Sequence, residues 1–105
     1  HGTIALIEEG IPVIALATQG PLFQKSLSNI KEVKARGAYV LAITQEGNTL
    51  IEEVADDVIY IPKISDILSG LLSIVPLQLL AYHISDSRGI DVDKPRNLAK
   101  SVTVE

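Results

Sequence analysis

Three short apolar runs recur along the chain, and each has the length and β-branched content of a buried strand. They cover residues 12–17, 38–43 and 57–61. The first two are nearly continuous in apolar residues, as parallel strands are when both faces of their sheet are covered. The third alternates more and ends at Pro62, which is typical of a strand nearer the edge of a sheet.

The segments between these runs have helical patterns. A Gly-Pro turn opens one segment, in which apolar residues recur at steps of three and four and form one stripe of Phe23, Leu27, Ile30 and Val33. Gly37 is placed to cap the end of this helix. Residues 1–9 also predict one helix, closed by Gly10, and residues 48–54 predict a further helical turn or two.

Residues 67–84 form the longest apolar stretch, with 12 apolar residues in 18, and they follow Asp66, a candidate N-cap. A membrane span needs about 20 predominantly apolar residues, and Pro76 and His83 interrupt this stretch. We therefore expect a buried helix with a candidate kink at Pro76. In such a helix His83 is a hydrogen-bonded core histidine rather than a ligand.

Strands that alternate with helices are joined by right-handed crossovers and build a parallel sheet. The predicted fold class is therefore α/β, a three-layer αβα arrangement with a mostly parallel, flavodoxin-like sheet. A helix ahead of the first strand indicates that another strand preceded it, so we expect the sheet to be incomplete on its N-terminal side. An unpaired strand edge predicts self-association or a marginal monomer. Helical periodicity stops after Gly89, which separates residues 1–89 from a tail of residues 90–105.

The charge and composition exclude several classes of protein. Thirteen acidic and nine basic residues give a net charge of −4, whereas a nucleic-acid binder needs a basic face to displace counterions from phosphates. Hydrophobic residues make up 47% of the chain, too many for a disordered protein. Cysteine is absent, which rules out disulfides, thiolate zinc sites and a cysteine nucleophile within this sequence.

The first residues lack the basic segment that opens a signal peptide. A cytoplasmic location is therefore expected, with no nucleic-acid or membrane partner. The chain begins at His1 and contains no methionine. A complete translation product normally begins with Met, so we interpret the sequence as a fragment or a processed piece.

Four segments resemble the isomerase domain of the glutamine–fructose-6-phosphate aminotransferases, also called glucosamine-6-phosphate synthases. The most specific segment is residues 91–105, which read DVDKPRNLAKSVTVE. Residues 75–83 look like the last helix of that domain, and residues 28–37 resemble its amphipathic helix. Residues 1–7 resemble a motif that more often begins with His-Gly-Pro than with His-Gly-Thr. The resemblance covers essentially the whole chain in order, and it makes residues 1–89 a partial sugar isomerase (SIS) subdomain.

The resemblance implies a parent enzyme that converts fructose 6-phosphate and glutamine to glucosamine 6-phosphate and glutamate without a cofactor. Lys100 matches the catalytic lysine that forms a Schiff base with the open-chain ketose, and Ala99 matches a substrate contact beside it. His1 matches a histidine implicated in opening the sugar ring, which in the family reaches the active site of the neighbouring subunit. The implied partners are a second subunit and the remainder of the parent polypeptide, which holds the glutaminase half and the first SIS subdomain.

Imine formation at Lys100 has a physical requirement of its own. A lysine with the usual pKa of about 10.4 is neutral to only roughly 0.04% at pH 7, and only the neutral amine attacks a carbonyl. A catalytic lysine therefore needs burial or a nearby cation to lower its pKa, and Arg96 is a candidate neighbour. Without the resemblance, the pattern alone favours a solvated lysine in a surface tail.

Parts of the family's machinery lie outside this sequence. The glutaminase half uses an N-terminal cysteine, and the Ser- and Thr-rich loop that holds the sugar phosphate belongs to the first SIS subdomain. The general-base glutamate of the family lies upstream of the His-Gly motif, and Glu8 and Glu9 do not replace it. We therefore expect little or no turnover by this chain alone.

Two other functions remain open. One is a non-catalytic SIS module that binds a sugar phosphate, as in regulators. The other is an SIS isomerase or deglycase that acts on another phosphosugar. A metal site is not predicted, because no histidine or third carboxylate accompanies the acidic pairs. The pair Asp56-Asp57 is interpreted as a turn, and Asp91 and Asp93 as a solvated loop.

Overall fold

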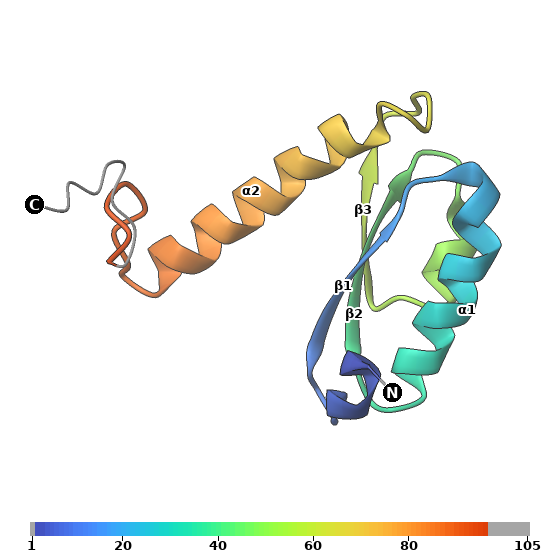
Figure 1. The fold of residues 1–105 in the computed structure, drawn as a ribbon, viewed down its shortest axis with the longest axis horizontal. Coiled ribbons are helices and arrows are strands. Elements are labelled where there is room, and N and C mark those ends of the chain that lie inside the picture. Colours follow the sequence, from blue (N-terminus) through green and yellow to red (C-terminus); the bar gives the residue numbers. More distant parts are fainter. Residues whose placement is uncertain (1, 97–105) are drawn as a thin grey trace, which may run out of the picture. The chain divides into compact units, whose positions relative to one another are not determined.

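The computed structural model describes residues 2–96 (Figure 1). Its elements are η1 (Thr3–Leu6), β1 (Pro12–Ala17), η2 (Gly20–Leu22), α1 (Phe23–Lys34), β2 (Tyr39–Gln45), η3 (Thr49–Glu53), β3 (Asp57–Ile61) and α2 (Ser69–Ser87). The chain divides into two compact units, residues 1–74 and residues 75–105, and the boundary falls within α2.

The sheet of the first unit consists of β1, β2 and β3 in that order, and all of its strand pairs are parallel. The register pairs Ala15 with Ala42 and Ala42 with Val58. These are the three strands that the apolar runs predict, although the second begins at Tyr39 and continues to Gln45. The predicted α/β fold class is confirmed.

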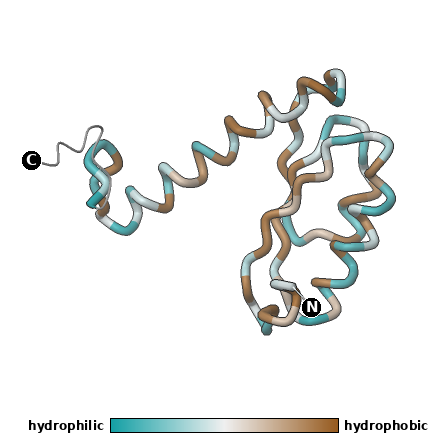
Figure 2. The backbone as a smooth tube through the Cα atoms, viewed as in Figure 1, coloured by the Kyte–Doolittle hydropathy of each residue, from teal (hydrophilic) through white to brown (hydrophobic). Residues whose placement is uncertain are grey.

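The core of this unit lies between α1 and the face of the sheet that α1 covers, and the strands there are mainly hydrophobic (Figures 1 and 2). The predicted apolar stripe of α1 points toward this core. The buried residues that α1, β1 and β2 contribute are Phe23, Leu27, Ile30, Ala17, Val40 and Ala42. Ile51 of η3 is completely buried in the same cluster. Small side chains thus line much of the boundary between helix and sheet.

The opposite face of β1 is apolar as well. Side chains alternate between the two faces of a strand, and Val13 and Ala15 pack against the core. Ile14 and Leu16 therefore lie on the other face, where they are 46% and 49% exposed. Both faces of β1 are therefore apolar, as the nearly continuous apolar run predicts for a parallel strand whose two faces are covered.

The first nine residues do not form the single helix that their pattern predicts. Their described part holds the four-residue 3-10 helix η1, after which the chain is extended at Ile7. None of the residues of η1 is buried, so it lacks the tertiary packing that supplies most helical stability. Gly10, the predicted closing glycine, instead has a φ of +76°, and its N–H donates to the carbonyl of Gly37 at 2.7 Å.

The prediction of a buried apolar helix is wrong for α2. The helix begins at Ser69, so Asp66 precedes it by three residues and is not its N-cap. Among the described residues of α2, the buried ones are Ser69 and Ser73, whereas Leu71 is 67% exposed. Apolar residues lie on all sides of α2, so packing on one side of the helix leaves many of them exposed.

His83 is exposed, so the expectation of a core histidine is also wrong. Its ring meets that of Tyr82 edge to face, with 5.2 Å between the centroids. Within residues 2–96, no helix has both the length and the apolar character needed to cross a membrane.

Candidate functional site

The three residues to which the resemblance assigns chemistry are Lys100, Ala99 and His1, and all three lie outside the described residues. Their roles therefore stay predictions. Arg96, the candidate neighbour of Lys100, is the last described residue and is exposed.

The second unit holds the described start of the tail. Asp91 Oδ1 accepts the N–H of Asp93 at 2.9 Å and the N–H of Lys94 at 3.1 Å, which closes a turn. A hollow of about 510 Å³ is lined by this turn and by Gln78 and Tyr82 of α2. The residues that line this hollow thus precede the segment with Lys100 in the sequence.

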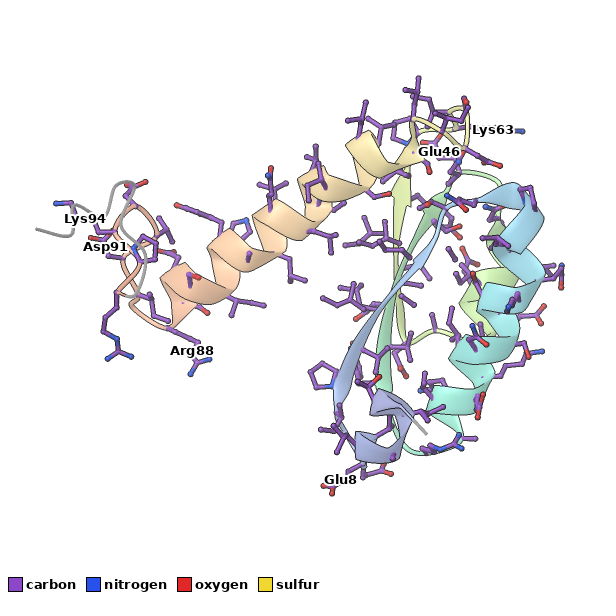
Figure 3. The ribbon with its side chains drawn as sticks, viewed as in Figure 1. Glu8, Glu46, Lys63, Arg88, Asp91 and Lys94 are labelled. Carbon is purple, nitrogen blue, oxygen red and sulfur yellow. The ribbon has the colours of Figure 1, made fainter. Side chains whose placement is uncertain are left out.

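A polar pocket of about 310 Å³ lies in the first unit, where the three strands end. Its walls lie at or just after the ends of β1, β2 and β3 and include Thr18, Gln45, Glu46, Asn48, Lys63 and Asp66. Figure 3 labels two of these residues, Glu46 and Lys63, at the end of the sheet toward which the strands run. Ligands of open parallel α/β sheets generally bind outside this carboxyl edge.

Gln45 connects the walls of this polar pocket. It is the last residue of β2 and is only 6% exposed. Its Nε2 donates to the carbonyl of Thr18 at 2.6 Å, and its Oε1 accepts the N–H of Ile64 at 2.9 Å. One buried amide therefore joins the segments that follow β1 and β3, and both of its ends are paired.

Thr44 and Asn48 fix the turn that follows β2. The Thr44 hydroxyl donates to the carbonyl of Ala17 at 2.7 Å and accepts from Asn48 Nδ2 at 3.1 Å. Gly47, inside this turn, has a φ of +94°, a conformation that glycine adopts without strain. The turn is therefore held to β1 by side-chain hydrogen bonds.

Asp66 supplies another part of the pocket wall. It is half-buried, and its Oδ1 accepts the N–H of Gly20 at 3.3 Å. Asp66, Glu46 and Lys63 are the charged residues of the lining. Two carboxylates against one ammonium give the pocket a charge of −1 when all three are ionised.

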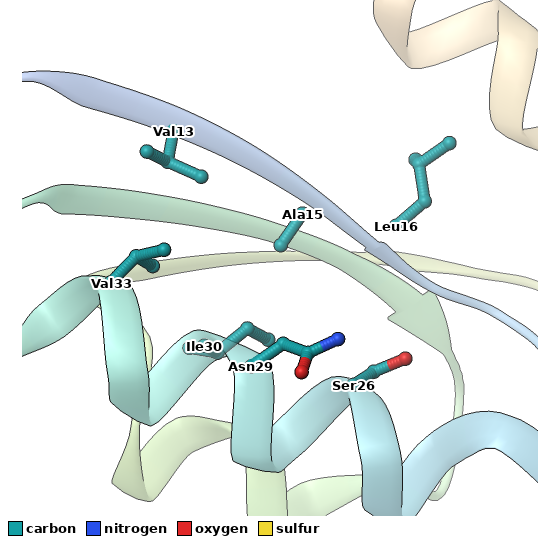
Figure 4. A pocket seen from close by; sticks show the side chains of 7 residues that line it. All are labelled: Val13, Ala15, Leu16, Ser26, Asn29, Ile30 and Val33. Atoms are coloured by element: carbon teal, nitrogen blue, oxygen red, sulfur yellow. The ribbon is translucent and has the colours of Figure 1, made fainter. Parts of the chain in front are cut away.

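A smaller hollow of about 200 Å³ lies between α1 and β1. Figure 4 shows Val13 and Ala15 on the strand side, with Ile30 and Val33 on the helix side. Its polar lining residues are Ser26 and Asn29. None of the residues that line it is ionisable, so it has no group for acid–base catalysis.

Two ionisable groups with shifted pKa values, Tyr39 and Asp56, lie near the beginnings of β2 and β3. The Asp56 carboxylate accepts from Lys34 Nζ at 2.6 and 2.8 Å and from the N–H of Val40 at 2.7 Å. These hydrogen bonds hold its pKa below the usual carboxyl range. The Tyr39 hydroxyl donates to Asp57, which raises the pKa of the tyrosine. Both aspartates therefore accept hydrogen bonds from other side chains. Residues 2–96 hold no group of three His, Asp or Glu side chains arranged for a metal.

The sequence profile of the SIS domain matches residues 1–85 of the chain. The chain belongs to the SIS domain family. The match covers all three strands, η3 and α1, together with most of α2. The SIS fold thus includes the whole first unit and its polar pocket.

Several curated relatives of this SIS chain are named as isomerizing glutamine–fructose-6-phosphate aminotransferases. The chain is 64% identical over all 105 residues to one from Caldanaerobacter subterraneus subsp. tengcongensis, 60% identical to one from Thermus thermophilus and 56% identical to one from Methanosarcina mazei. It spans 17% of the length of each of them. The predicted resemblance is therefore confirmed over the full chain.

Solved structures with the same fold include a domain of a related enzyme. The C-terminal domain of glucosamine-fructose-6-phosphate aminotransferase from Francisella tularensis aligns with a TM-score of 0.79 and 34% identity. The alignment covers 90% of this SIS chain and 27% of that chain. The likeness supports the α/β architecture of the parallel sheet and its helices.

The polar pocket was missed by the sequence interpretation, although a signal for it exists. Thr18 follows β1 directly, Gln45 ends β2, and Lys63 comes two residues after β3. Polar residues at the ends of consecutive parallel strands meet at one edge of the sheet. The apolar runs of this SIS domain do not reveal the pocket, because they mark the strands and not the residues that follow them.

Proposed function

We propose that this chain is the isomerase-domain portion of a glutamine–fructose-6-phosphate aminotransferase. In this function it binds fructose 6-phosphate as a lysine Schiff base and isomerises it during amination to glucosamine 6-phosphate, with glutamine as nitrogen donor. The extent of the similarity carries the proposal. Relatives of that name are 52–64% identical over all 105 residues, whereas the SIS profile ends at residue 85. The similarity of the tail beyond residue 85 therefore supports an aminotransferase function over other functions of the SIS family.

In the proposed reaction Lys100 acts as the nucleophile. Its neutral amine adds to C2 of the open-chain ketose, and loss of water forms an imine. Ammonia released from glutamine displaces the lysine and leaves an imine at C2. A base then removes a proton from C1 to give an enolamine, and protonation at C2 together with loss of the proton on O1 yields the 2-amino aldose. The covalent step replaces one difficult addition by two easier ones.

The other predicted residues assist this step. Ala99 contacts the substrate beside Lys100, and the imidazole of His1 assists ring opening in the active site of the neighbouring subunit. The general base and the phosphate-binding loop come from the remainder of the parent chain. The proposal therefore includes a cytoplasmic homodimer of the parent, and it predicts little or no turnover by the 105-residue chain alone.

A chimera tests this function. This chain replaces the matching segment of the Thermus thermophilus relative, and glucosamine 6-phosphate is measured after addition of fructose 6-phosphate and glutamine. We expect an active enzyme in which Lys100→Ala lowers kcat by at least about 1000-fold, because the covalent intermediate is lost. Lys94→Ala, six positions earlier in the same tail, is the matched control and should retain activity.

Borohydride reduction in the presence of fructose 6-phosphate should attach the sugar covalently to Lys100, as peptide mass spectrometry would show. Full activity of the Lys100→Ala chimera would refute the proposal. A folded chimera that binds fructose 6-phosphate but neither traps it nor turns it over would instead support the non-catalytic SIS module.

A further inference from the structure

We propose that the polar pocket at the ends of β1, β2 and β3 binds an uncharged, hydroxylated molecule of monosaccharide size. None of the described residues that line this pocket is one to which the resemblance assigns chemistry. The proposal is therefore a second binding function beside the one proposed above.

Size and position support a ligand site. The pocket holds about 310 Å³, which is at the lower end of the range for small-molecule sites and suits a single sugar ring. It lies at the carboxyl edge of the parallel sheet, where open α/β folds bind ligands. Its walls come from three separate segments of the chain, so the polar groups converge on one space.

The walls are held in place by bonds that do not involve a ligand. Gln45 joins the segments after β1 and β3, and Thr44 with Asn48 fixes the turn after β2. The backbone N–H of Gly20 holds Asp66 through Oδ1. A pocket whose polar groups are already oriented loses little entropy when it binds.

Unused hydrogen-bonding capacity points to hydroxyl groups as the ligand chemistry. None of the described residues donates a hydrogen bond to Asp66 Oδ2 or to Asn48 Oδ1. Both oxygens belong to residues of the lining, and both are acceptors that suit the O–H groups of a polyol. Asn48 Nδ2 and Lys63 supply donors for the hydroxyl oxygens, and the half-buried Ile64 offers an apolar surface to the ring carbons.

The charge of the lining disfavours an anionic ligand. Glu46 and Asp66 are opposed only by Lys63 within this lining. A phosphate dianion would meet a net charge of −1 and two carboxylates, and like charges at close range repel. An uncharged sugar avoids this repulsion and still uses the acceptors.

Nuclear magnetic resonance titration of the 105-residue chain tests the proposal. Backbone amide shifts are followed as D-fructose, D-glucose or fructose 6-phosphate is added. We expect saturable shifts with a millimolar Kd for at least one neutral sugar, confined to the amides of Gly20, Gly47 and Ile64 and their neighbours. Fructose 6-phosphate should bind this pocket more weakly than fructose.

Asp66→Asn keeps an oxygen for the N–H of Gly20 but removes the negative charge, and it should weaken sugar binding at least fivefold. Asp86→Asn, on exposed α2 surface, is the matched control and should not change the Kd. Glu46→Gln is a second variant of the pocket lining, at an exposed position. If Asp66→Asn unfolds the chain, which loss of its dispersed NMR spectrum would show, the sugar affinity of Glu46→Gln tests the proposal instead.

Shifts that grow linearly without saturation for every sugar would overturn the proposal, as would an unchanged Kd in both lining variants. Tighter binding of fructose 6-phosphate than of fructose at these amides would overturn the assignment to uncharged ligands. Lys100→Ala should leave this titration unchanged. The NMR titration tests the pocket proposal and the chimera assay tests the proposed function, so either proposal can fail without the other.

Discussion

Gly37 lies where the chain after α1 passes residues 9 and 10, and it permits no side chain. Its φ is +91°, and a Cβ built there would lie 2.9 Å from the Cα of Glu9. A left-handed conformation costs alanine about 1–2 kcal/mol. Because the obstructing atom is backbone, relief requires the two segments to separate, which adds about 1–3 kcal/mol. We expect Gly37→Ala to lower the free energy of unfolding by about 2–5 kcal/mol.

Variants of two other glycines separate the cost of the left-handed backbone from the cost of the steric clash. Gly10 also has a positive φ, +76°, but its Cβ would meet nothing within 4 Å, so Gly10→Ala should cost only about 1–2 kcal/mol. Gly70 lies near the start of α2, has no positive φ and also has open space around it. Gly70→Ala should therefore be neutral or stabilise the helix by up to about 1 kcal/mol.

Urea unfolding followed by far-ultraviolet circular dichroism measures all three variants under one condition. The contrast between Gly37→Ala and Gly10→Ala is the decisive quantity, because both share the backbone cost. Equal losses in these two variants would show that residues 9 and 37 do not approach each other as described. A loss in Gly70→Ala as large as that in Gly37→Ala would refute the role assigned to positive φ.

Three further predictions concern other features. Lys34 lowers the pKa of Asp56 in the folded state. The stability from this pair is therefore present above the usual carboxyl pKa of about 4 and is lost as pH falls through the lowered pKa. Asp56→Asn should flatten the acid side of a plot of Tm against pH, and an unchanged plot would contradict this. Ile51→Ala, at a completely buried position, should cost about 2–5 kcal/mol in urea unfolding, and a loss below about 1 kcal/mol would argue against its burial. The unpaired edge of β1 predicts self-association that rises with concentration in analytical ultracentrifugation and weakens in Leu16→Lys; a compact, highly stable monomer at all concentrations would contradict it.

The sheet could be predicted because its strands are marked by a local signal. Apolar runs with β-branched residues identified all three strands, and helical segments between them implied the parallel order. The end of β2 was missed because Thr44 and Gln45 are polar. Both are nevertheless buried in the strand, since their side chains bond to the carbonyls of Ala17 and Thr18. These hydrogen bonds, which offset the cost of burying polar groups, depend on the neighbouring segment and cannot be predicted from a local sequence pattern.

The helices show where a local pattern is insufficient. The stripe of α1 faces a sheet, and its prediction is confirmed. The apolar residues of α2 have no single stripe, so their burial depends on how much other surface covers them, which the pattern does not contain. Residues 1–9 have a helical pattern, but their described part forms only η1, because none of its residues is buried and packing supplies most helical stability.

The candidate sites show a similar division. The resemblance of the tail identified Lys100, Ala99 and His1, whose roles remain predictions. The polar pocket could have been located from the residues that follow each strand. Its hydrogen bonds could not, since the amide of Gln45 bridges to positions 18 and 64. A contact between residues so distant in sequence exists only once the register of the strands is set.

The alanines between α1 and the sheet determine how closely these two layers pack. Ala42 is completely buried at this boundary, and Ala38 and Ala17 are 2% and 1% exposed. A leucine at position 42 would displace α1 outward, because a close-packed interior has no room for three extra carbon atoms. Gly20 belongs to η2, which leads directly into α1, so one wall would move with the helix. The affinity of the proposed sugar site is therefore adjustable from inside the core, through a residue that a bound sugar would never touch.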